Sequence, residues 1–280
     1  MNINKTSGIG RRIALWSGVL ALAALTGCAS VQTTQSGAIG VERKQLMASS
    51  VPASQLQLEA NKQYAQMMAE ARSAGALDTN NAQVRRVRAI TNRLIAQVGA
   101  FRGDAAGWPW EVHVISSDQV NAWCMPGGKM AIYTGLINRI QPTDDELAAV
   151  LGHEMAHALR EHSREQISQQ MATQVGLSVL SAVTGVAAAG DLGAALTNVM
   201  FTLPNSRTHE SEADLIGVEL AARAGYDPRA AVTLWQKMAA LGGGSAPPEF
   251  LSTHPAAATR SAELQRNAEK VMPLYEAARR

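Results

Sequence analysis

The sequence has few of the residues on which disulfide-rich, aromatic-rich or highly charged proteins depend. Its two cysteines exclude a disulfide framework. Aromatic residues make up 4% of the 280 positions, so aliphatic side chains and methionine must fill the core. This composition favours closely packed helices over an all-β sandwich. With 46% hydrophobic and 17% charged residues, the chain is not a disordered tail, and it is long enough for a sizeable core.

Acidic residues are absent from the first 27 positions, where three basic residues precede an apolar run over residues 13–25. This run is shorter than a membrane span and matches the hydrophobic region of a secretory signal. It ends in Leu-Thr-Gly-Cys, which resembles the bacterial lipoprotein signal, in which the cysteine is lipidated and becomes the new N-terminus. We therefore predict a lipoprotein signal peptide at residues 1–27 and lipidation of Cys28. An uncleaved anchor helix with an incidental cysteine is the alternative.

The predicted mature chain carries almost no net charge. Removing residues 1–27 leaves 22 basic and 23 acidic residues, which gives no electrostatic basis for binding nucleic acid. Ala29 follows the cysteine, whereas an aspartate there favours inner-membrane retention in Gram-negative lipoproteins. This indicates the cell outer membrane, on its periplasmic face. Residues 28–53 are rich in small and polar side chains and are predicted to form a lipid-anchored flexible tether.

Hydrophobic periodicity predicts one α+β domain over residues 54–280, with many helices and a small sheet. Helices are expected at 54–74, 81–98, 143–170, 208–224, 228–241 and 256–280. Alternating β-branched residues predict a strand at 110–115, and 121–135 should form two short strands around a Pro-Gly-Gly turn. Thr143 and Glu146 have the spacing of a capping box and mark a helix start.

The segment 171–203 is rich in Ala, Gly, Val and Ser and almost uncharged. Each half is short for a membrane span and holds several polar residues. A buried or membrane-grazing helical pair is therefore favoured over an inserted hairpin. Insertion would place the protein at the inner membrane.

The sequence His153-Glu154-Met155-Ala156-His157 lies inside the helix that begins after Thr143. Histidines four residues apart project from one helix face, so both imidazoles can reach one metal ion. Glu154 is placed to hold a water and take its proton, which is the general-base role in metal-assisted peptide hydrolysis. A helix with two solvated histidines is the alternative.

A second predicted helix supplies carboxylates with the same spacing. Glu210 and Asp214 are four residues apart and share a face. One can ligate the metal while the other fixes a ligand histidine, which completes a site of two histidines and one carboxylate. The alternative is a solvated acidic face that also includes Glu212.

These motifs together resemble one family of zinc endopeptidases, which includes the CAAX prenyl protease, HtpX and the periplasmic quality-control protease BepA. The resemblance covers residues 55–265. It is carried by His153–His157, Ser206–Gly217, Ser252–Pro255, Asn121-Ala122 and Pro126–Gly128. It implies a mainly helical zincin-like (gluzincin) domain with a small β-sheet beside the zinc helix, holding one Zn²⁺ per chain.

The resemblance also implies roles for single residues. Glu210 is the third ligand beside His153 and His157, and Asp214 supports catalysis by orienting a ligand. Asn121 and Ala122 belong to an edge strand that binds extended substrate by strand addition. The membrane spans of the CAAX protease and HtpX and the repeat array of BepA are not found, so the chain resembles a short, lipid-anchored periplasmic member.

His254 lies in a Ser-Thr-His-Pro loop that the resembling family places over the site. Three roles stay open: a latch in the fourth metal position, a contact to the transition-state oxyanion, or loop packing. His113 and His162 are expected to be structural, His209 is not assigned to the metal, and Cys124 is expected to be buried packing. We therefore predict a zinc metalloendopeptidase that degrades misfolded or stalled envelope proteins, with the outer-membrane assembly machinery as a partner. A non-proteolytic, chaperone-like assembly lipoprotein is the rival.

Overall fold

The computed structural model describes residues 28–181, 191–241, 249–255 and 259–280, so the predicted signal peptide at 1–27 lies outside the described residues. The α-helices are α2 (Ala53–Ser73), α3 (Asn81–Ile95), α4 (Thr134–Ile140), α5 (Asp144–Leu159), α6 (His162–Ser181), α7 (Leu192–Phe201), α8 (Arg207–Arg223), α9 (Ala230–Leu241), α10 (Glu249–Thr253) and α11 (Arg260–Ala278). The strands are β1 (Cys28–Val31), β2 (Gln45–Ala48), β3 (Glu111–Ile115), β4 (Ala122–Met125) and β5 (Lys129–Tyr133). Short 3₁₀ turns follow α3 at Val98–Ala100 and Gly103–Gly107. The predicted α+β class, mainly helical with a small sheet, is confirmed.

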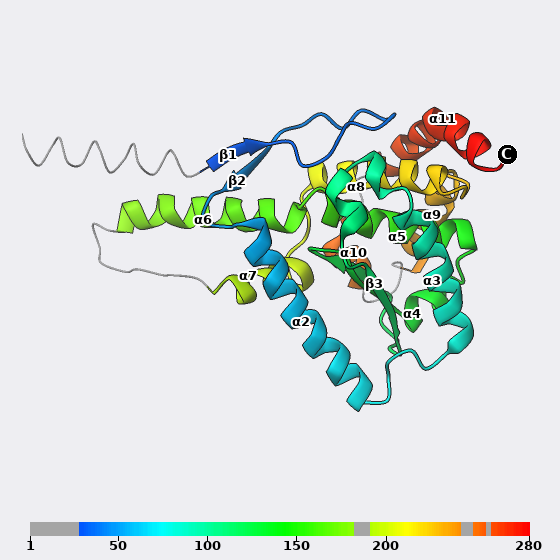
Figure 1. Cartoon of the computed structure of the whole chain (residues 1–280), viewed down its shortest axis with the longest axis horizontal. Helices are drawn as coiled ribbons and strands as arrows, with labels where there is room; N and C mark the ends of the chain where they lie inside the picture. The colour runs from blue at the N-terminus through cyan, green and yellow to red at the C-terminus, as the bar shows by residue number, and fades with distance from the viewer. Residues whose placement is uncertain (1–27, 182–190, 242–248, 256–258) are drawn as a thin grey trace, which may run out of the picture.

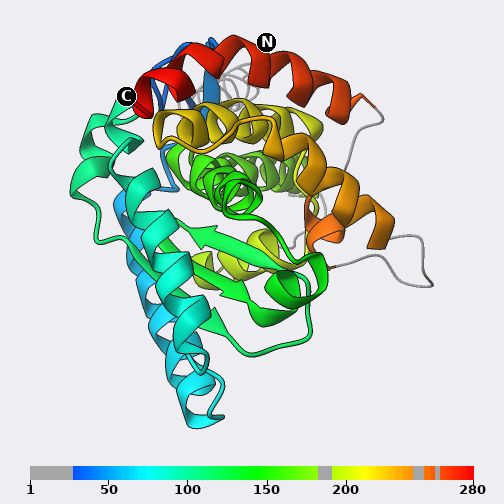
Figure 2. The same ribbon diagram turned by 90° about the vertical axis from the view of Figure 1, so that its right-hand side faces the viewer.

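Helix α5 is the central element of the fold (Figure 1). Side chains all round it are buried, as is expected for a helix rich in Ala and Leu that is covered on every side. It packs between the three-stranded sheet and α8, and α11 covers α8 from outside (Figure 2). Its start is the predicted capping box, in which the Thr143 hydroxyl accepts from the Glu146 backbone and the Glu146 carboxylate accepts from the Thr143 backbone.

The sheet has the strand order β3-β5-β4. Strands β3 and β5 are parallel, and β4 and β5 form the predicted antiparallel hairpin around the Pro-Gly-Gly turn. Gly128 has a φ of 83°, and a Cβ there would come within 2.6 Å of the Trp110 ring, so the turn needs glycine. In the order β3-β5-β4, strand β4 lies at an edge, with only β5 beside it in the described sheet.

The prediction of one helix over 143–170 is wrong. Helix α5 ends at Leu159, and Glu161 takes a left-handed conformation with φ 52° before α6 begins. The carboxylate of Glu161 accepts hydrogen bonds from Arg102 at 2.6 Å and Arg164 at 2.8 Å. These contacts hold a conformation that non-glycine residues rarely adopt, and no glycine or proline marks it in the sequence.

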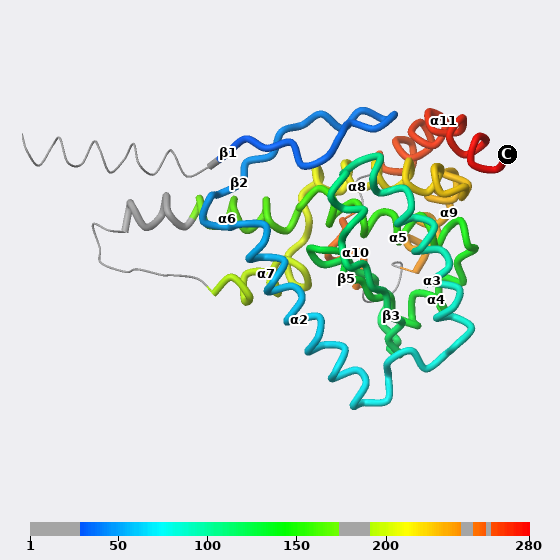
Figure 3. The backbone as a smooth tube through the Cα atoms, viewed as in Figure 1, coloured from blue at the N-terminus to red at the C-terminus, as the bar shows by residue number. Residues whose placement is uncertain are grey.

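Residues 28–52, here named the N-terminal strap, also differ from the expected flexible tether. The strap forms the antiparallel pair β1–β2 and runs along α6 to α8 and back (Figure 3). Met47 and Val51 are buried, and the buried carboxylate of Glu219 in α8 accepts from the backbone of Ala38 and Ile39. The polar composition that indicated flexibility instead supplies buried hydrogen bonds.

Helices α6 and α7 contain the described part of the uncharged segment 171–203. Helix α7 packs against α2 and α6, burying Leu196 and Val199. Residues 182–190 of the expected helical pair lie outside the described residues. Among the described residues, no helix combines the length and the apolar character that a membrane span needs.

Candidate metal centre

Four side chains converge at the centre of the fold, three from two helices and one from the residue after a third helix. Helix α5 presents His153 and His157, α8 presents Glu210, and His254 follows α10. One potential ligand atom of each lies within 4.8 Å of the other three, and all four residues are buried. The Nε2 atoms of His153 and His157 are 3.1 Å apart, and each is 3.4 Å from a carboxylate oxygen of Glu210. The structure thus brings together the three predicted ligands and His254.

Two glycines allow the helices to approach closely at this point. A Cβ on Gly217 would come within 2.8 Å of the His153 backbone nitrogen, and one on Gly152 would be 3.0 Å from the Gly217 carbonyl. At the crossing of α5 and α8, Gly217 therefore leaves no room for a Cβ, and Gly152 leaves little. The crossing brings His153 opposite Glu210 and Asp214, which lie one turn apart on α8.

Carboxylate and guanidinium groups hold these side chains in place. Asp214 Oδ1 lies 3.0 Å from His153 Nδ1, as expected for a residue that orients a ligand histidine. Arg260 donates to Glu210 at 3.1 Å and to Asp214 at 2.7 Å, and its guanidinium stacks 3.3 Å over the Trp235 ring. The sequence does not single out Arg260, because nothing near it in the chain marks a site.

The electrostatics of the group favour a cation. Burial alone would lower the pKa of His153, but the negative charges of Glu210 and Asp214 raise it to about 9. Burial alone would raise the pKa of Glu210, but His254 and His153 hold it well below the ordinary value. Burial lowers the pKa of His157, so its imidazole stays neutral. Two histidine imidazoles and an ionised carboxylate form a donor set that fits a divalent metal such as zinc.

Glu154 is also buried beside this group. Its Oε1 lies 3.5 Å from His254 Nε2 and accepts no hydrogen bond within the described part of the chain. Burial raises the pKa of its carboxyl group. A buried carboxylate oxygen without a partner is suited to accept a proton from a reactant in the site.

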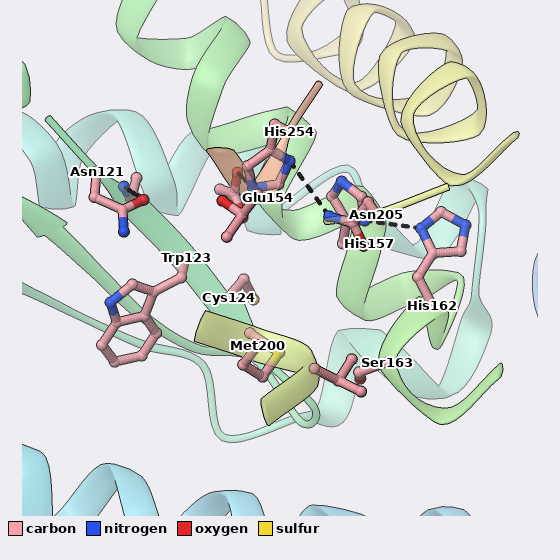
Figure 4. Close-up of a pocket in the computed structure, with 13 residues that line it drawn as sticks. Asn121, Trp123, Cys124, Glu154, His157, His162, Ser163, Met200, Asn205 and His254 are labelled. Carbon is pink, nitrogen blue, oxygen red and sulfur yellow. Dashed lines mark hydrogen bonds and ion pairs between the residues drawn. The ribbon is translucent and has the colours of Figure 1, made fainter. Parts of the chain in front are cut away.

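The edge strand lines one pocket together with His157 and His254 of the metal-ligand group (Figure 4). Its lining includes Asn121 and Ala122, Glu154 and His157, and residues of α7 and α10. The predicted substrate strand therefore lies at the candidate site. Cys124 is buried as predicted, and burial raises the pKa of its thiol well above the ordinary value.

The remaining histidines lie outside the four-residue group. His113, on β3, contacts Asp78 and Glu111. His209, on α8, contacts Glu165. His162 is closer to the site than the sequence indicated, since its Nδ1 lies 2.9 Å from His157 Nδ1 (Figure 4).

This fold and site define a metallopeptidase: a buried His-Glu-x-x-His helix crosses a second helix that supplies a glutamate beside the edge strand. The model of "Peptidase family M48" matches residues 81–268, and the chain belongs to this family.

Relatives with similar sequences carry peptidase names. The mitochondrial metalloendopeptidase OMA1 of Arabidopsis thaliana is 41% identical over 55% of this chain and 31% of its own length. That of Schizosaccharomyces pombe is 38% identical over 64% of this chain and 51% of its own. The β-barrel assembly-enhancing protease of Escherichia coli is 32% identical over 59% of this chain and 36% of its own. The chain thus spans about a third to a half of these relatives. The names and the family match support the predicted metalloendopeptidase class.

Proposed function

We propose that the chain is a zinc-dependent endopeptidase, anchored by a lipid on Cys28 to the periplasmic face of the outer membrane. Its substrates are misfolded or stalled periplasmic and outer-membrane proteins. The observation that carries the activity is the convergence of His153, His157 and Glu210. His157 also lines one pocket with Glu154 and the edge strand β4. His153, His157 and Glu210 would hold one Zn²⁺ per chain.

Bound zinc would supply Lewis-acid polarisation of a peptide carbonyl and acidify a water molecule. The residues of the chain transfer the proton, orient a ligand and align the substrate. Glu154 accepts the proton of the attacking water and passes it to the leaving amine. Asp214 keeps His153 in one tautomer and orientation. The outer edge of β4 aligns an extended peptide by backbone hydrogen bonds, which suits unfolded segments because they expose their backbone.

The substrate class and location are supported by features outside the metal site. The lipoprotein-like ending at Cys28 indicates export and anchoring, and Ala29 favours the outer membrane. One relative is named for enhancing β-barrel assembly. This supports envelope proteins as substrates and the outer-membrane assembly machinery as a partner.

Zinc content and cleavage of an unfolded protein test this proposal. Purified protein should contain one zinc per chain by mass spectrometry and cleave casein, and a zinc chelator should stop the cleavage. Zinc without cleavage of any unfolded protein would favour the chaperone-like rival, whereas absence of zinc would reject the metal site.

We expect His254→Ala to raise proteolysis of casein and self-cleavage. His254 Nδ1 lies 3.0 Å from Glu210 Oε1 and 3.3 Å from His153 Nε2, within the potential ligand set. A histidine there would compete with water for the fourth metal position, so its removal frees that position. Initial rates of wild type and variant at equal zinc content measure the effect. A loss of about 10²-fold or more would instead assign His254 to oxyanion stabilisation, and an unchanged rate would assign it to loop packing.

We expect Cys28→Ser to abolish lipidation and processing at residue 28. The variant should keep its first 27 residues and incorporate no labelled fatty acid, as gel mobility and palmitate labelling would show. Cys124→Ser is the matched control, because it removes the other cysteine, which is buried in the core. Fatty-acid labelling of the Cys28→Ser protein would contradict the anchor.

A further inference from the structure

A second cluster of polar and ionic groups, buried except for the partly exposed Arg43, lies next to the metal-ligand group. Glu212 is two residues from Glu210 on α8 and so faces away from it. The cluster joins the N-terminal strap, α6 and α8, and consists of Arg43, Gln45, Arg160, His162, Glu165, His209 and Glu212. None of these residues belongs to the metal-ligand group, although His162 lines the same pocket as His157.

A chain of hydrogen bonds connects this cluster to His157. His162 Nε2 lies 3.1 Å from Glu212 Oε2, and His162 Nδ1 lies 2.9 Å from His157 Nδ1. An ionised carboxylate can only accept, so His162 carries its proton on Nε2 and offers Nδ1 as an acceptor. His157 then donates from Nδ1, which leaves the lone pair of its Nε2 facing the potential ligand set.

His153 reaches the same state by a shorter route, through Asp214 alone. The two histidines therefore have different supports: a carboxylate for His153, and a histidine backed by a carboxylate for His157. Such partners fix the tautomer and ring orientation of metal-binding histidines.

We propose that His162 and Glu212 are positioning residues for His157, and that Arg43 of the N-terminal strap holds Glu212 in place for this task. The proposal rests on the zinc site proposed above.

Arg43 contacts two carboxylates of the cluster at once. Its guanidinium donates to Glu212 at 2.6 and 3.1 Å and to Glu165 at 2.6 and 2.8 Å. Paired, bidentate contacts of this kind fix both carboxylates. Arg160 also donates to Glu212, at 2.9 and 3.0 Å. Two buried carboxylates need such partners, and one of the two arginines comes from the segment that follows Cys28. The N-terminal strap must therefore be packed in place for Arg43 to hold Glu212, and through His162 this affects the position of His157.

A matched pair of amides tests the role of His162. In His162→Asn the side-chain oxygen can take the place of Nδ1 and accept from His157, whereas His162→Gln places its amide near the former Nε2, facing Glu212. We expect zinc affinity, measured by chelator competition, to stay within about threefold in the Asn variant and to fall by about 10–100-fold in the Gln variant. Cobalt(II) absorption should change in the Gln variant only. Equal affinities, or the reverse order, would overturn the positioning role.

A second pair tests the strap in the full-length protein. Arg43→Met should weaken zinc binding by about tenfold, the lower end for such partners, because Arg160 still supports Glu212. Arg223→Met is the control, since Arg223 also pairs with a buried glutamate that anchors the strap, Glu219, but does not touch Glu212. Equal zinc affinity in these two variants would overturn the role of Arg43. If the wild type itself bound no zinc, the proposed function would fail rather than this inference.

Discussion

Glu154→Gln should retain zinc but lose peptide hydrolysis. The amide keeps the size of the side chain and cannot accept the proton of the attacking water, while His153, His157 and Glu210 are untouched. Loss of a general base typically lowers a rate by about 10²–10⁴-fold. Casein cleavage under single-turnover conditions, with zinc quantified in the same sample, measures the effect.

Glu161→Gln is the control for this variant. Glu161 follows the same helix and is ion-paired with Arg102 and Arg164, but does not line the pocket that contains Glu154. Its rate should stay near that of the wild type. Wild-type cleavage by Glu154→Gln would remove the assigned base, and loss of zinc from it would mean that Glu154 supports the metal rather than the reaction.

The sequence allowed the central part of the site to be predicted because its geometry is local to two helices. His153 and His157, like Glu210 and Asp214, are four residues apart, and helical periodicity alone puts each pair on one face. The crossing of these helices depends on Gly217, where a Cβ would come within 2.8 Å of the His153 backbone. No local rule predicts such a crossing, and the choice of Glu210 as the third ligand came from the resemblance to a family.

The parts that could not be predicted depend on contacts between distant segments. Arg260 reaches Glu210 from α11, and Arg43 reaches Glu212 across 169 residues of sequence. A side chain of this kind carries no local mark, since an arginine in a polar helix or loop is usually exposed. The left-handed residue Glu161 was missed for the same reason, because its conformation is held by Arg102 and Arg164.

The N-terminal strap shows the limit of composition as a guide. Ser, Thr, Gln and Gly predict a tether when nothing else is known, because such segments bury little apolar surface. Here the polar groups are satisfied inside the protein. Gln45 is fully buried and donates to Glu165 and to the Arg160 backbone. Only these partners, which lie far away in the sequence, show that the predicted flexible tether is held against the rest of the protein.

Removal of the carboxylate ligand should abolish stable zinc binding. Glu210→Ala deletes a ligand and should lower zinc affinity by more than the roughly 10–100-fold expected for a residue that only orients a ligand. Asp214→Ala removes a residue that only orients a ligand, since it deletes the hydrogen bond to His153 Nδ1 and leaves all ligands present. Zinc competition with a chelator should therefore rank wild type above Asp214→Ala, and Asp214→Ala above Glu210→Ala.

Both variants free the guanidinium of Arg260 from one of its two carboxylates, so a general effect of that disturbance is shared between them. The difference between the variants then reports the ligand itself. Unfolding midpoints of the metal-free proteins check that both fold. Equal zinc affinity in the two variants would remove Glu210 from the ligand set, and would leave His254, whose Nδ1 lies 3.3 Å from His153 Nε2, as the third donor beside the two histidines of α5.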